Sequence, residues 1–189
     1  MTVNGVPATC ASGVPVSPDS VPGAAISPGL RRDVLAGLHE DVGVASSYLG
    51  DHALARELWA SGIHEARILA ALVDEPARVT PEQMDAWAAD FDSWDVVDQV
   101  CSNLFDKTPF AYQKAFEWSK RPEEFVRRAG FTMMCCLAVH DKPAPDKNFL
   151  QFLPIIKREA TDERNFVKKA VNWALRQIGK RNAALRTGL

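Results

Sequence analysis

The sequence predicts an all-α fold of stacked helix pairs, and three observations lead to that prediction. From residue 30 onward, apolar residues recur with the 3.6-residue period of a helix. No segment combines apolar–polar alternation with the β-branched enrichment of a strand, so we expect no sheet. Helix start signals such as Thr80-Pro81 and Thr108-Pro109 recur along the chain. Their spacing predicts helices of moderate length with short connectors.

Each expected helix has its own start signal. Asp51 is expected to cap a helix that ends at Ser61–Gly62. In Thr80-Pro81-Glu82-Gln83, Thr80 is the expected N-cap and Gln83 its capping-box partner. The other helices are expected at 63–73, at 94–105 after Ser93, from Thr108-Pro109, from Pro122, from Asp146 with a kink at Pro154, and from Thr161-Asp162 to about Gly179.

The first 29 residues differ from the rest of the chain. They contain five prolines, four glycines and a single charged residue, Asp19. Proline removes backbone hydrogen bonds, and this stretch shows no periodicity. We therefore expect a disordered tail over residues 1–29 and one folded domain over residues 30–189.

Three helical segments resemble one another, because each has a basic residue followed by a small or apolar run. These basic residues are Arg67, Arg128 and Lys169, separated by 61 and 41 residues. The second spacing falls within the ~40–47 residues of a HEAT-type helix pair. The pattern predicts a HEAT/ARM-like helical-repeat solenoid. An ordinary α-bundle is the alternative, since short matches also arise by chance.

Composition excludes several classes of protein. A chain of 189 residues with 47% hydrophobic residues suits one globular domain. No apolar run approaches the ~20 residues of a membrane span, and the N-terminus lacks a secretory signal. The four cysteines form no CxxC pair, which favours a reduced, cytoplasmic protein. The histidines show no zinc spacing and no nucleotide-binding motif is present, so we expect neither metal nor cofactor.

The net charge of −2 hides a strong asymmetry along the chain. Residues 1–119 contain 7 Lys and Arg against 17 Asp and Glu, whereas residues 120–189 contain 15 against 7. A split of this size suggests that the C-terminal third meets a polyanion. The alternative is a solvated basic face on a protein of balanced charge.

A cationic stripe with one aromatic residue is expected on the last long helix. Lys169, Trp173, Arg176 and Lys180 are spaced i, i+4, i+7 and i+11. In such a stripe the ring can contact a sugar or base while the cations hold phosphates. Trp173 could instead be a tryptophan at the edge of the core.

Two other helices offer candidates. Trp94 and Asp98 lie one helical turn apart, and a half-buried carboxylate beside an indole can align water or stabilise positive charge. Asp98 could also be a surface residue near a packed ring. Arg127 and Arg128 lie in an otherwise apolar helix. A buried arginine must reach a ligand or an ion-pair partner, and both possibilities remain open.

Four segments in order resemble the AlkD-type DNA alkylation repair glycosylases. They are Leu58-Trp-Ala-Ser-Gly-Ile-His-Glu-Ala-Arg67, Phe91-Asp-Ser-Trp-Asp-Val-Val-Asp98, Phe125-Val-Arg-Arg-Ala-Gly130 and Asn165-Phe-Val-Lys-Lys-Ala-Val-Asn-Trp-Ala-Leu-Arg176. The resemblance covers roughly residues 50–182. It implies a solenoid whose concave basic face holds duplex DNA with alkylated bases. It also implies hydrolysis of the N-glycosidic bond of N3- and N7-alkylated purines, without a metal, a cofactor or a base-flipping pocket.

The resemblance also assigns roles to residues. It implies that Asp98 is the catalytic carboxylate, that Trp94 and Trp173 face the lesion, and that Arg128 grips a phosphate, with Arg127 as the alternative. Arg176 is expected as a neighbour on the same face.

The ends of the chain depart from the family pattern, which usually has further helices before residue 30 and after residue 182. We therefore expect a shortened member of the family, and we also expect a monomer. A catalytically silent HEAT-like module that binds DNA or a protein is the alternative.

Overall fold

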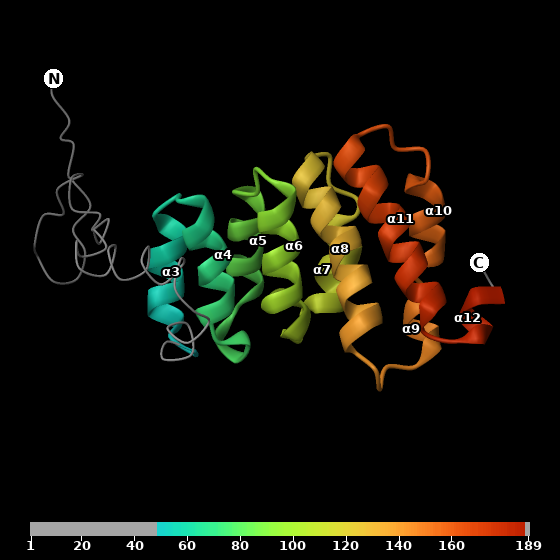
Figure 1. Ribbon diagram of the computed structural model, residues 1–189, viewed down its shortest axis with the longest axis horizontal. Coiled ribbons are helices and arrows are strands. Elements are labelled where there is room, and N and C mark those ends of the chain that lie inside the picture. Colours follow the sequence, from blue (N-terminus) through green and yellow to red (C-terminus); the bar gives the residue numbers. More distant parts are fainter. Residues whose placement is uncertain (1–48, 188–189) are drawn as a thin grey trace, which may run out of the picture.

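The computed structural model describes residues 49–187, which form a row of helices (Figure 1). The prediction of an all-α fold is confirmed, since no strand occurs within these residues. The expected tail over residues 1–29 lies outside the described residues. The helices are α3 (His52–Ala60), α4 (His64–Val73), α5 (Pro81–Ala89), α6 (Trp94–Asn103), α7 (Ala111–Trp118), α8 (Glu124–His140), α9 (Asp146–Leu150), α10 (Leu153–Glu159), α11 (Asn165–Lys180) and α12 (Ala183–Thr187), with short 3-10 turns at Pro76–Arg78 and Phe105–Lys107.

The helices are arranged as stacked pairs. Helices α4, α6, α8 and α11 pack side by side, each against the next, and we call this row the inner layer. Helix α3 packs on α4, α7 on α8, and α10 on α11. Figure 1 shows the pairs following one another from α3 at one end to α12 at the other. This arrangement matters for function because it brings residues from distant repeats onto one surface.

The cap predictions are partly confirmed. Asp51 accepts a hydrogen bond from the Leu54 amide at 3.0 Å, and Thr80 accepts one from the Gln83 amide at 3.2 Å. The Gln83 side chain, however, donates to Asp74 at 2.8 Å. The predicted capping box is therefore wrong, because the Gln83 side chain is hydrogen-bonded to Asp74 of the preceding helix pair instead of to the Thr80 backbone.

Helix α6 starts at Trp94 as predicted, whereas other details differ from the sequence prediction. Ser93 precedes α6, but its side chain makes no capping hydrogen bond. The expected kink at Pro154 is a break between α9 and α10. Helix α11 begins at Asn165 rather than at Thr161, because the Asp162 carboxylate accepts the Arg164 amide in a turn just before the helix.

Helix α8 lies at the centre of the core and is buried along most of its length. It passes very close to the end of α7 at Gly130. A Cβ at this glycine would lie 2.4 Å from the Ser119 backbone nitrogen. Only glycine allows the two helices to approach so closely, so this residue sets the spacing between them.

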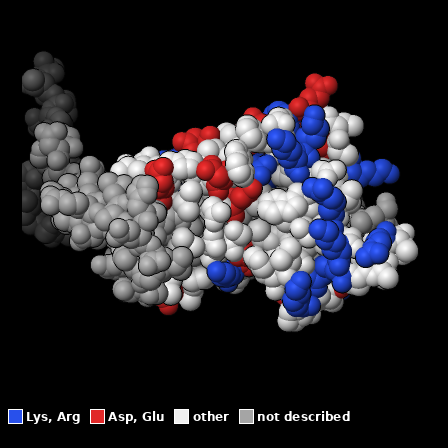
Figure 2. Space-filling model, in the orientation of Figure 1, with Lys and Arg blue, Asp and Glu red and all other residues white. Residues whose placement is uncertain are grey.

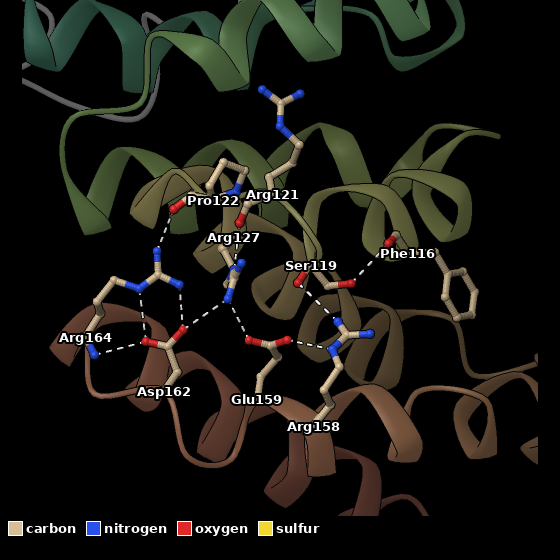
Figure 3. A network of polar contacts seen from close by, with 9 residues as sticks. All are labelled: Phe116, Ser119, Arg121, Pro122, Arg127, Arg158, Glu159, Asp162 and Arg164. Carbon is tan, nitrogen blue, oxygen red and sulfur yellow. Dashed lines mark hydrogen bonds and ion pairs between the residues drawn. The ribbon is translucent and has the colours of Figure 1, made fainter.

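A polar network joins the α7–α8 connector to α10 and α11 (Figure 3). Three arginines from different segments donate to backbone carbonyls of the connector. These bonds are Arg127 to Arg121 at 2.6 Å, Arg158 to Ser119 at 3.4 Å and Arg164 to Pro122 at 2.6 Å. The arginines therefore satisfy connector carbonyls that lie outside the helical hydrogen-bond pattern.

Two carboxylates complete the network. Glu159 accepts from Arg127 at 2.7 Å, and Asp162 accepts from Arg164 at 2.5 Å and from Arg127 at 3.3 Å. The Arg164 hydrogen bond is the main reason that the pKa of Asp162 is lowered to about 2. The network fixes the position of α11 relative to α8, and the candidate site lies between these two helices.

Candidate nucleic-acid interface

Three candidate residues occupy equivalent positions in the inner layer. Asp98, Arg128 and Lys169 are each the fifth residue of their helix, α6, α8 and α11. These helices pack in that order, so the stacking places the three residues in a line across the layer. Residues 71 positions apart in the sequence thus meet on one surface.

Asp98 and Arg128 form a two-point ion pair. Arg128 Nε donates to Asp98 Oδ1 at 3.1 Å, and Nη2 donates to Oδ2 at 2.7 Å. The remaining end of the guanidinium, Nη1, donates to the Phe166 carbonyl at 2.8 Å. Thr132 Oγ1, one turn after Arg128, also donates to Asp98 Oδ1 at 3.1 Å. The carboxylate is therefore held from two successive turns of α8.

The pair is largely withdrawn from solvent. The side chains are 6% exposed for Arg128 and 17% for Asp98. Burial raises the pKa of Asp98 above its ordinary value, although hydrogen bonds from Arg128 and Thr132 oppose this effect. Hydrogen bonds from Arg128 and Thr132 thus favour the ionised form of Asp98, which burial disfavours.

A groove opens over this pair, with a volume of about 570 Å³. Asp98 and Arg128 lie on one side of it, and residues of α11 line the other. The α11 residues are Lys168, Lys169, Asn172, Trp173 and Arg176. Both lysines and Arg176 are exposed. The groove therefore combines exposed cations, an indole and a carboxylate held by hydrogen bonds, which suits a ligand with both anionic and flat apolar parts.

Figure 2 shows how charge divides over this face, with Lys and Arg gathered along α11 and Asp and Glu over the α4–α6 side. On the acidic side, Asp92 is 70% exposed and lies 3.4 Å from Arg67. Asp95 lies 2.8 Å from His64. The asymmetry of the sequence is therefore an asymmetry of one surface, and the basic half coincides with the groove.

The structure brings most of the predicted site residues together. Asp98, Arg128, Lys169, Trp173 and Arg176 all line the groove. Trp173 also packs against the core, so the groove and core-edge interpretations both hold for it.

Trp94 and Lys180 lie outside the groove lining. Trp94 is 52% exposed, one turn before Asp98 on α6. Lys180 is exposed at the end of α11, one turn beyond Arg176. Both extend the surface around the groove.

Arg127 is directed elsewhere and belongs to the network of Figure 3. Its side chain is paired with Glu159 and Asp162 and is 19% exposed. Of the two possibilities left open for this residue, the structure shows the ion pair. Adjacent residues on a helix point about 100° apart, so Arg127 and Arg128 cannot serve the same site.

Sequence reasoning missed three residues near the site, namely Lys168, Asn172 and Thr132. Lys168, Asn172 and Arg176 follow an i, i+4, i+8 spacing that a second stripe on the helical wheel would have revealed. Thr132 lies one turn after Arg128 on the same face of α8, but a buried threonine in an apolar helix gives no signal of its own.

Neither a metal site nor a membrane span is found in residues 49–187. No group of three His, Cys, Asp or Glu residues in this part of the chain could hold a metal ion. No helix there is long and apolar enough to cross a bilayer.

The fold and the groove together define a helical-repeat protein with a cationic surface on one layer of its stacked pairs. Comparison with known protein families identifies the family to which this helical-repeat protein belongs. Residues 24–188 match the family described as DNA alkylation repair enzyme, and the chain belongs to this family. The family expected from the four sequence motifs is thus confirmed.

One solved structure is similar in fold, with a TM-score of 0.71 and 20% sequence identity. It comes from work describing "a new family of proteins related to the HEAT-like repeat DNA glycosylases with affinity for branched DNA structures". The alignment covers 78% of this chain and 63% of that one, so the chain spans less than two thirds of its structural neighbour. The HEAT-like fold is therefore confirmed. No curated protein sequence matches the chain.

Proposed function

We propose that the protein binds duplex DNA through this groove and releases N3- and N7-alkylated purines by hydrolysing the N-glycosidic bond. The observation that carries the proposal is the position of Asp98. This carboxylate is held in the lining of a groove that Trp173 and exposed cations also line. A surface that only bound phosphates would need the cations alone.

The chemistry suits these residue types. An alkylated purine is already cationic, so the C1′–N bond can break with its electron pair leaving on the purine. Positive charge then develops on the deoxyribose, where the Asp98 carboxylate would stabilise it and orient a water molecule. Water adds to C1′ and loses a proton to the carboxylate or to solvent. The indoles of Trp173 and Trp94 offer π faces to the same cation.

The cations of α11 would hold the DNA backbone. Lys168, Lys169 and Arg176 are exposed along one helix, and no carboxylate of residues 49–187 lies within salt-bridge distance of them. Their positive charges are available to neutralise phosphates, which supplies affinity without sequence preference.

A second candidate function is DNA binding without hydrolysis. It is favoured by the ion pair itself, because Arg128 already neutralises the carboxylate that would stabilise a sugar cation. Affinity for branched DNA, as stated for the structural neighbour, would be the corresponding activity.

The two functions are separated by incubating the full chain with methylated duplex DNA and measuring released 7-methylguanine and 3-methyladenine. We expect release by the parent protein. Asp98→Asn keeps the shape of the side chain but removes its charge. It should reduce release by about 10²-fold, the scale of one lost electrostatic stabiliser. DNA affinity should stay nearly unchanged or rise slightly.

Asp92→Asn is the matched control, because it removes a carboxylate from the exposed acidic side of the same surface. It should leave base release unchanged. If Asp98→Asn released bases at the parental rate, the carboxylate would not be catalytic. A parent protein that releases no base but prefers branched over linear DNA would establish the second function.

A further inference from the structure

Arg128 is the cation nearest to the proposed catalytic carboxylate, but its surroundings differ from those of the other cations in the groove. Its side chain is 6% exposed. Lys168, Lys169 and Arg176 are exposed and reach the groove from α11. A phosphate approaching the groove therefore meets the α11 cations first.

The Arg128 guanidinium already donates hydrogen bonds to groups within the protein. Nε and Nη2 bind the two oxygens of Asp98, and Nη1 binds the Phe166 carbonyl. These bonds use three of the five guanidinium N–H groups, and Asp98 already neutralises the charge. A phosphate bound to the two remaining N–H groups would place its negative charge beside the Asp98 carboxylate, which is unfavourable.

Thr132 completes the arrangement from a position that DNA cannot reach. The residue is fully buried, and its hydroxyl donates to Asp98 Oδ1 at 3.1 Å. Oδ1 thus accepts from both Arg128 and Thr132, whereas Oδ2 accepts from Arg128 alone. Both carboxylate oxygens are therefore held by α8, and Oδ1 is held from two successive turns of that helix.

We propose that Arg128 and Thr132 are positioning residues, which hold the Asp98 carboxylate toward the groove, and that Arg128 is not a phosphate ligand. The role of these two residues in base release rests on the function proposed above. The statement about phosphate binding does not, because the phosphate contacts are assigned to α11 whether or not the protein hydrolyses the glycosidic bond.

The first test is the salt dependence of binding to an unmodified duplex, measured for the full chain. Lys169→Ala should lower the slope of log K against log salt by about 0.9, the value for one phosphate contact. Arg128→Gln should leave that slope at the parental value. A slope for Arg128→Gln that falls as far as that for Lys169→Ala would show that Arg128 neutralises a phosphate and overturn the proposal.

The second test uses the buried threonine. Thr132→Val removes the hydroxyl with little change of shape, and Thr132→Ser retains it. The valine variant should raise the pKa of Asp98, followed by carbon NMR of its carboxyl group, while the serine variant should stay close to the parent. The two hydrogen-bond donors oppose the effect of burial on this carboxyl group, so the direction of the shift is fixed. An unchanged pKa in Thr132→Val would contradict the positioning role.

Base release provides the third readout. Thr132→Val should slow release roughly 10-fold, as expected for one lost hydrogen bond to a charged group. The acidic limb of the pH profile should move to higher pH, and Thr132→Ser should restore both. Thermal unfolding of each variant separates these effects from loss of fold. If the parent releases no base, only the proposed hydrolysis fails, since the salt slope and the NMR titration still decide the roles of Arg128 and Thr132.

Discussion

Under the proposed function, Trp173 is a residue on which both DNA binding and the rate of base release would depend. It lines the groove and packs against the core, so its ring is held in place before DNA arrives. A ring in contact with the sugar acts in the bound state and in the transition state alike. Trp173→Ala should therefore weaken DNA binding and slow base release, each by roughly 10-fold, within the range of one lost stacking contact.

The measurement is a binding isotherm and a single-turnover rate on the same methylated duplex. Trp173→Phe keeps a π face and should recover part of both. Because the indole also contacts the core, the folded fraction of each variant is determined by thermal unfolding. Losses that merely follow the folded fraction would show that Trp173 serves the core alone.

The sequence predicted which residues belong to the site more completely than it predicted how they pair. Helical spacing and the family motifs identified Asp98, Trp173, Lys169 and Arg176. The pairing of Asp98 with Arg128 depends on the register of α6 against α8, which neither helix encodes by itself. Local periodicity contains no information about that register, so the two possibilities for each arginine stayed open until the stacking was known.

Among the helices, the close contact between α7 and α8 predicts that alanine at position 130 lowers stability, although helix propensity alone predicts the opposite. Alanine is a better helix former than glycine by about 1 kcal/mol. At Gly130, however, an added Cβ would collide with the Ser119 backbone. Gly130→Ala should destabilise the protein by about 2 kcal/mol, the usual cost of overpacking a core. Urea denaturation measures this change, and a stabilised variant would show that the helices can separate freely.

The network between the α7–α8 connector and α11 predicts a pH dependence of stability. The folded pKa of Asp162 lies below its ordinary value of 3.8, at about 2, chiefly through its hydrogen bond with Arg164. A lowered pKa means that the stabilisation is fully present above about pH 4 and is lost as the pH falls toward 2. Asp162→Asn should thus cost about 2 kcal/mol at neutral pH.

The stabilities of parent and Asp162→Asn should converge as the pH falls through 2, because the parental carboxyl group becomes protonated over that range. Glu163→Gln is the control, since it removes an exposed carboxylate from the next position. A constant difference between parent and Asp162→Asn across this range would mean that the amide disturbs packing rather than charge.

Helix boundaries were predictable where local chemistry decides them. Asp51 and Thr80 cap α3 and α5 as expected, because an N-cap bond closes within three residues. The predicted capping box at Gln83 was wrong, because its side-chain amide donates to Asp74 in the preceding helix pair. The predicted start of α11 was wrong for a related reason, since Asp162 forms ion pairs with two arginines just before the helix. Tertiary partners that lie far along the chain override such local signals.

Across the stacked pairs as a set, the separation of charge predicts where DNA would bind under the proposed function. The α11 side of the inner layer is basic and the α4–α6 side is acidic (Figure 2). Arg176→Ala should lower the salt slope of duplex binding by about 0.9. Arg78→Ala removes an equal charge from an exposed position in the acidic half. It should leave the slope unchanged. Equal effects of the two variants would mean that net charge, rather than the groove, controls binding.

The unequal exposure of the five tryptophans gives the protein an optical property. Trp59, Trp87 and Trp118 are buried, whereas Trp94 is 52% exposed beside the groove. The red edge of the emission spectrum should therefore arise mainly from Trp94, and iodide should quench this component first. A duplex bound over α11 and α6 would shield the same indole from the quencher. The unlabelled protein thus contains its own fluorescent probe, located one helical turn from Asp98.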